Sequence, residues 1–142
     1  MAKGRGADEH RRKLLEGLAG QVIEVGAGQG TNFPYYPSSV ERVVATEPED
    51  YLRHRAEQAA TSAPIPVSVV AGTAEDLPGE EGSFDAGVVS LVLFTVPDQE
   101  RALGELFRVI RPGGALRFYE HVISRRAPYA YIQRLEEATF WP

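Results

Sequence analysis

The sequence contains no cysteine, which excludes disulfides, thiolate metal sites and a cysteine nucleophile. No apolar run approaches the roughly 20 residues that a membrane-spanning helix needs, and the first residues lack the apolar segment of a secretory signal. Positive charge is not in excess, because the net charge is −5, and this argues against a nucleic acid as the main partner. No cluster of metal ligands is visible, so we expect no metal site. Without cysteines or a secretory signal, a cytoplasmic setting is the default expectation.

The 142 residues, 43% of them hydrophobic, are enough for one domain, and we expect 1–142 to form a single one after a mobile tail at 1–7. Apolar runs and amphipathic segments alternate, which favours an α/β fold with a parallel sheet. Asp8 is a plausible cap for the first helix, and Asp98 for a later one. The pattern predicts strands at 22–25, 42–46, 67–71, 85–93 and 115–120, and helices at 8–18, 49–60, 98–110 and 128–140.

The most informative segment follows the first predicted strand and reads Glu24-Val25-Gly26-Ala27-Gly28-Gln29-Gly30. Glycine permits a positive φ and lets a ligand approach the backbone, and ligands bind at the carboxyl edge of open α/β sheets. A dinucleotide fingerprint would need a third glycine at position 31, which is Thr31. This spacing disfavours an NAD-dependent oxidoreductase. Pro34 and Pro37 then predict that the next helix is short or distorted.

The glycine segment resembles the first motif of class I S-adenosylmethionine (SAM) dependent methyltransferases, and other segments extend the likeness in the same order. Glu47 ends the second predicted strand, 72–78 resembles G-D-A-E-x-L-P, 82–89 resembles D-G-S-F-D-x-V, and 106–114 resembles L-x-R-V-L-R-P-G-G. Together these motifs cover roughly residues 20 to 121 and are typical of a type 11 methyltransferase domain. The resemblance implies a Rossmann-like, doubly wound, mostly parallel sheet with strand order 3-2-1-4-5.

Members of this family normally add two strands after the fifth, whereas this sequence supplies five in our interpretation. An uncovered fifth strand would be a pairing hazard. We therefore expect either a C-terminally truncated chain or a homodimer in which a second copy covers the open edge.

The resemblance also implies which residues bind SAM and its product S-adenosylhomocysteine (SAH). Glu24 is expected to accept from the α-amino group, directly or through a water molecule, and Glu47 from both ribose hydroxyls, since its two oxygens match two O–H donors. Thr73 stands where the family commonly has an aspartate for the adenine amine. The full predicted set is Glu24, Gly26, Ala27, Gly28, Gly30, Asn32, Glu47, Pro48, Thr73, Ala74, Glu75 and Ser90.

Glu120 and His121, at the end of the fifth predicted strand, are the candidates for catalysis, because an imidazole can take a proton at neutral pH. His10 and His54 lie in polar helical segments and are expected at the surface, whereas Tyr35 and Tyr36 are candidates to cover the methionine moiety or touch a substrate.

Several segments together resemble a narrower group, the small thiol methyltransferases and their bacterial relatives: Asn32-Phe33-x-x-Tyr36-Pro37, Leu91-Val92-Leu93 with Val96-x-Asp98-Gln99, and Tyr119-Glu120-His121. By this resemblance the methyl acceptor is a small apolar molecule, a thiol or another soft nucleophile. The residues at 91–94 are apolar, and they either line such a pocket or belong only to the core. An alternative function is a SAM-binding core without catalysis of its own.

Overall fold

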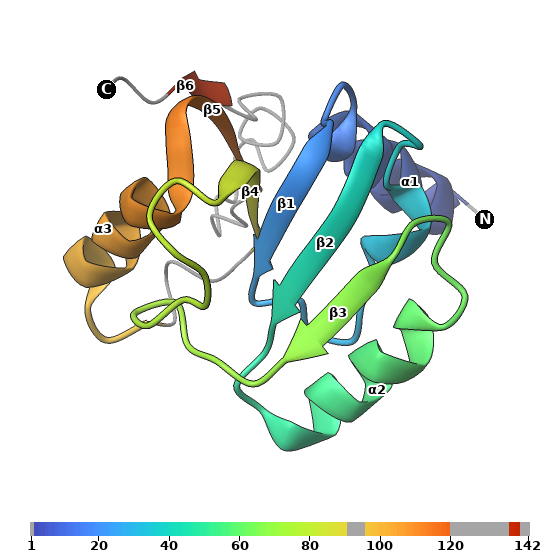
Figure 1. The fold of residues 1–142 in the computed structure, drawn as a ribbon. Coiled ribbons are helices and arrows are strands. Elements are labelled where there is room, and N and C mark those ends of the chain that lie inside the picture. The colour runs from blue at the N-terminus through green and yellow to red at the C-terminus, as the bar shows by residue number, and fades with distance from the viewer. Residues whose placement is uncertain (1, 91–95, 120–136, 140–142) are drawn as a thin grey trace, which may run out of the picture.

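Residues 2–90, 96–119 and 137–139 of a computed structural model of the chain are described here. Within them the strands form one six-stranded sheet in the order β3-β2-β1-β4-β5-β6 (Figure 1). The first five strands run parallel and β6 is antiparallel to β5, so the predicted order 3-2-1-4-5 is confirmed. The strands are β1 (Gly20–Val25), β2 (Val40–Thr46), β3 (Val67–Val70), β4 (Phe84–Ser90), β5 (Ile110–Tyr119) and β6 (Glu137–Thr139).

The helices are α1 (Ala2–Leu15), the 3-10 turn η1 (Phe33–Tyr35), α2 (Asp50–Ala60) and α3 (Gln99–Val109). Two of them begin at capping carboxylates. Glu49 accepts a hydrogen bond from the amide of Leu52 at 2.6 Å, and Asp98 accepts one from the amide of Arg101 at 3.0 Å. The brevity of η1 confirms the prediction made from the prolines.

The sheet is covered on both faces because its strands alternate between two cores. On β1, Val22 packs into the cluster that contains Leu14 of α1 and Ala56 of α2. The next residue, Ile23, packs instead with Leu106 and others of α3. Successive side chains of a strand point to opposite faces, so α1 and α2 cover one face and α3 covers the other. This is the doubly wound arrangement that was predicted.

The start of the chain differs from the prediction. Residues 2–7, expected as a tail, form the first turns of α1, which ends at Leu15. Asp8 therefore lies inside the helix and is not its cap. A hydrogen bond between the Asp8 carboxylate and the hydroxyl of Tyr35 raises the pKa of that tyrosine above its usual value. Contacts with η1 fix the position of this helix, and such tertiary contacts cannot be predicted from the local sequence pattern.

The C-terminal prediction was wrong for residues 137–139, which form β6 and not helix. β6 pairs with Ala115, Leu116 and Arg117 of β5. Backbone groups on a strand edge need partners, and this pairing supplies them along those three residues. The edge of β5 is thus covered there within one chain, which removes the reason given for a homodimer at this position.

Candidate functional site

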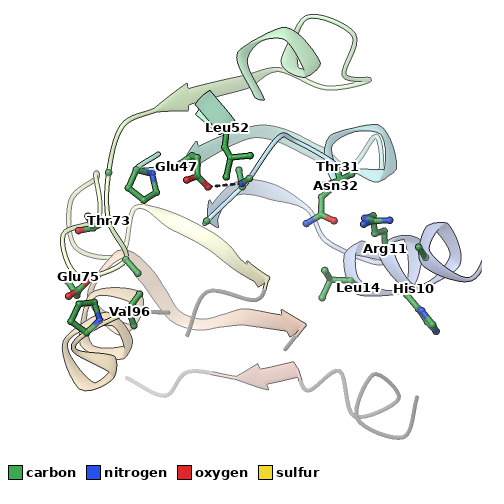
Figure 2. A pocket seen from close by; sticks show the side chains of 18 residues that line it. His10, Arg11, Leu14, Thr31, Asn32, Glu47, Leu52, Thr73, Glu75 and Val96 are labelled. Carbon is green, nitrogen blue, oxygen red and sulfur yellow. Dashed lines mark hydrogen bonds between the residues drawn. The ribbon is translucent and has the colours of Figure 1, made fainter. Parts of the chain in front are cut away.

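A pocket of about 500 Å³ lies where the parallel strands end (Figure 2). Its walls are the segments that follow β1, β2, β3 and β4 in the chain, together with one side of α1. This is the sheet edge at which ligands bind in open α/β folds. The predicted residues that line the pocket are Gly26, Ala27, Gly28, Asn32, Glu47, Pro48, Thr73, Ala74 and Glu75.

The glycine segment turns at the end of β1 and is held by β2. Gly26 and Gly28 have φ values of +74° and +60°, which side chains rarely adopt. The amides of Gly26 and Ala27 both donate to the carbonyl of Thr46, at 3.0 and 2.9 Å. A Cβ built on Gly28 would meet nothing within 4 Å, so this backbone borders open space in the pocket.

Gly30, the third glycine of the motif, is tightly surrounded by side chains. It does not line the pocket, and a Cβ there would lie 2.7 Å from a ring carbon of Phe33 and 2.9 Å from Cβ of Ala59. Its φ of +84° also favours glycine. The third glycine of the motif therefore permits close packing of η1 and α2 on the turn.

Glu47 follows the last residue of β2 and is 6% exposed. One of its carboxylate oxygens accepts from the amide of Gly28 at 2.8 Å, and the other accepts from the amide of Glu49 at 3.0 Å. A carboxylate has about four acceptor positions, so two amides orient it and leave capacity for further donors. The group faces the pocket between the glycine turn and Leu52 of α2 (Figure 2).

Glu24 lies next to the pocket without lining it. The side chain is 1% exposed, and its carboxylate accepts from the Tyr36 hydroxyl at 2.6 Å and from the Asn32 amide nitrogen at 3.3 Å. Burial raises the pKa of Glu24 to about 7, against the effect of these two hydrogen bonds. Tyr36, a candidate to touch a ligand, is only 3% exposed and belongs to this buried cluster, so that prediction was wrong. Asn32 connects the cluster to the pocket, which it lines.

The opposite wall consists of Thr73, Ala74 and Glu75, beside Val96 and Pro97. Two residues of α3 hold this loop. The guanidinium of Arg101 donates to the Glu75 carbonyl at 3.2 Å, and Glu105 accepts from the Leu77 amide at 2.8 Å. The loop is thus fixed to α3, on the far face of the sheet.

Sequence reasoning missed the wall formed by α1. Ala7, His10, Arg11 and Leu14 line the pocket, and His10, expected at the surface, is half-buried there. His54 is exposed, as expected. The spacing of 7, 11 and 14 is that of one helix face, but the helix was predicted to begin at residue 8, six residues later than it does, so Ala7 fell outside it.

The remaining predicted residues are not described at the level of side chains. Ser90 is the last residue of β4, at the same edge of the sheet, and its backbone pairs with Tyr119 of β5. Glu120 and His121 lie outside the described residues, as do 91–94. In the ranges that are described, no group of three or more acidic or histidine residues could hold a metal ion, and no helix there is long and apolar enough to cross a membrane.

Comparison with known proteins decides the family. A methyltransferase domain family (type 11) matches residues 23–118, well over half of the chain. The chain belongs to the class I SAM-dependent methyltransferases. The match begins in β1 and ends in β5 of this methyltransferase, so it includes the glycine turn, Glu47 and the Thr73 loop.

Relatives of this methyltransferase carry different acceptors in their names. Human thiol S-methyltransferase TMT1A is 36% identical over 78% of this chain and 46% of its own length. Demethylmenaquinone methyltransferase of Thermobifida fusca is 38% identical over 67% of this chain and 41% of its own length. A Thermotoga maritima SAM-dependent methyltransferase, described as a possible histamine N-methyltransferase, has a TM-score of 0.67 and 26% identity over 96% of this chain and 65% of that one. The chain spans about half the length of the curated relatives it matches.

Proposed function

We propose that the pocket binds SAM and that the protein transfers its methyl group to a small apolar acceptor, a thiol or another soft nucleophile. The position of Glu47 carries this proposal. Its carboxylate is oriented by the amides of Gly28 and Glu49 inside a pocket bordered by a glycine turn, and a pair of oxygens held in this way suits a ribose diol. The open space over Gly28 supports the same fit, because a ligand can lie against backbone there.

The other proposed cofactor-binding residues form two groups, one at each end of the pocket. Pro48, Thr73, Ala74 and Glu75 would flank the adenine, while Gly26 and Asn32 would border the methionine moiety. Bound SAM supplies a methyl group already activated on a sulfonium, so the protein has mainly to orient the two reactants, an effect equivalent to roughly 7–11 kcal/mol in favourable systems. Glu120 and His121 are the proposed residues for removing the proton of a thiol, whose ordinary pKa of about 8.5 is within reach of a modest base.

The acceptor is proposed from the relatives. Human TMT1A and TMT1B are both thiol S-methyltransferases and are 36% and 34% identical to this chain. The alternative, a SAM-binding core without catalysis, was motivated by missing terminal strands, and β6 weakens that motive by pairing with β5.

Titration calorimetry with SAM, SAH and NADH tests the cofactor. We expect SAM and SAH to bind and NADH not to bind. Glu47→Gln should lower the affinity for SAH about tenfold or more, because hydrogen bonds to a charged acceptor are roughly twice as strong as neutral ones. Glu41→Gln, an exposed residue at the other end of β2, is the matched control and should leave the affinity unchanged. Equal SAH affinity in wild type and Glu47→Gln would refute the assignment of the diol site.

The acceptor is tested by following SAH release from SAM with a panel of small alkyl thiols, amines and phenols. Turnover that is fastest with the thiols supports the proposal. Binding of SAM without turnover on any acceptor would favour the alternative of a binding core, and turnover restricted to amines or phenols would contradict the thiol assignment.

A further inference from the structure

One wall of the pocket belongs to none of the methyltransferase motifs. It is the face of α1 that carries Ala7, Arg11 and Leu14, which follow one another at intervals of four and three residues, with His10 beside them. Residues spaced in this way lie on the same side of a helix. Arg11 is half-buried on this face.

α1 is held in position by contacts on both sides of Arg11. On one side, Asp8 hydrogen-bonds Tyr35 of η1, and the Arg12 guanidinium stands over the same ring at 5.3 Å from its centre. At the end of the helix, Arg117 of β5 donates to the carbonyls of Leu14 and Glu16 at 3.0 and 2.7 Å. These contacts fix the backbone that carries Arg11, so its side chain reaches the pocket from a defined place.

The charges of the pocket are separated along its length. Among its described lining residues Arg11 is the one arginine or lysine, and the acidic ones are Glu47 and Glu75. Figure 2 shows Arg11 on the side of Asn32, Glu75 at the other end near Val96, and Glu47 between them. An elongated ligand with hydroxyls in its middle and an anionic group at one end would complement this distribution.

We propose that Arg11 binds the carboxylate at the amino-acid end of the cofactor, an inference that rests on the proposed function. With the ribose on Glu47 and the adenine at the Thr73 wall, the amino-acid end extends toward Asn32 and α1. A guanidinium presents two parallel N–H donors to a carboxylate, and such pairs are among the stronger hydrogen bonds in proteins. Partial burial limits the competition from water and salt at this end of the pocket. Arg11 thereby orients the sulfonium through the rest of the ligand and is a binding residue outside the known motifs.

The experiment compares two ligands that differ only at this end. SAH carries the amino-acid group, whereas 5′-methylthioadenosine retains the adenine, ribose and sulfur but lacks it. Both are titrated into the wild type, Arg11→Gln, Arg11→Lys and Lys13→Gln. Lys13 is exposed on the same helix and provides a control for the loss of one positive charge.

We expect Arg11→Gln to weaken SAH binding about tenfold or more and to leave 5′-methylthioadenosine binding unchanged. The SAH affinity of Arg11→Lys should lie between those of the wild type and Arg11→Gln, since lysine keeps the charge and loses the second parallel donor. Lys13→Gln should bind both ligands as the wild type does. Thermal unfolding of each variant, followed by circular dichroism, accompanies the titrations.

Two results would overturn the inference alone. The first is unchanged SAH affinity in Arg11→Gln when the wild type binds SAH, and the second is an equal loss for both ligands, which would mean that Arg11 only supports the shape of the pocket. A wild type that binds neither ligand would refute the proposed function together with this inference, so the two failures are distinguishable.

Discussion

Alanine at Gly30 and alanine at Gly28 should have different main consequences, although both glycines belong to one motif. A Cβ on Gly30 would lie 2.7 Å from a Phe33 ring carbon and 2.9 Å from Cβ of Ala59, whereas a Cβ on Gly28 would meet nothing within 4 Å. We expect Gly30→Ala to damage the fold and Gly28→Ala to damage ligand binding.

The magnitudes follow from two contributions. An L-residue in the left-handed region costs roughly 1–2 kcal/mol, and both positions have such a φ, at +84° and +60°. Overpacking a tight contact adds roughly 1–3 kcal/mol, and this applies to Gly30 alone. The free energy of unfolding should therefore fall by about 2–5 kcal/mol in Gly30→Ala and by about 1–2 kcal/mol in Gly28→Ala.

Gly104 provides the matched control. It lies inside α3 and is exposed, and a Cβ there would meet nothing within 4 Å. Gly104→Ala should raise the free energy of unfolding by about 0.5–1 kcal/mol, because alanine loses less backbone freedom in a helix.

The free energy of unfolding of all three variants is measured by urea unfolding, monitored by far-ultraviolet circular dichroism. SAH titration is done without urea, at a temperature at which each variant is folded. Gly28→Ala should bind SAH more weakly than Gly104→Ala, since its methyl group would occupy open space beside a residue that lines the pocket. The reasoning is refuted if Gly30→Ala is no less stable than Gly28→Ala, or if Gly28→Ala binds SAH as the wild type does.

Two further predictions concern the surroundings of the pocket. The pKa of Glu24 is about 7 in the folded protein, against 4.5 ordinarily, so the folded state holds this proton more tightly and stability is lost as the pH rises from about 4.5 to about 7. The loss is roughly 3 kcal/mol, and urea unfolding at pH 5 and pH 8 should show it in the wild type but much less in Glu24→Gln. Arg108 donates to the carbonyls of Leu77 and Gly79 at 2.9 Å each, so Arg108→Ala should cost about 1–2 kcal/mol in thermal unfolding. Arg55→Ala, an exposed control on α2, should lower the free energy of unfolding by less. An equal loss in the two variants would contradict the role of Arg108 in holding the loop at Leu77 and Gly79.

The sheet was predictable because its information is local. The parallel strands β1 to β4 contain short apolar runs, and the glycine turn, the Glu49 and Asp98 regions, Pro34 and Pro37 mark where elements start or stop; β5 was predicted only in its second half, from Ala115. β6 was not predictable in this way, since Glu137–Thr139 becomes a strand only by pairing with the edge of β5. Local propensity is a weak guide where a tertiary partner supplies the hydrogen bonds.

The site was predictable as far as its residues belong to strand ends. The edge formed by β1, β2 and β3 collects the glycine turn, Glu47 and the Thr73 loop, as parallel strands require. The contribution of α1 to the pocket wall depends on where this helix packs, and the helix lies outside the motifs. Asp8 and Arg12 fix its packing position through their contacts with Tyr35. No spacing in the sequence reveals this contact.

The two acidic residues expected to hold the cofactor show how strand register separates similar side chains. Glu24 precedes the last residue of β1, and it faces the α1 side of the sheet, where Tyr36 and Asn32 enclose it. Glu47 follows the last residue of β2, so it leaves the sheet and is turned into the pocket by two amides. A ligand can reach Glu47 directly, but it meets Asn32 before Glu24. Glu24 should therefore act on the ligand through Asn32, the residue that contacts both its carboxylate and the pocket.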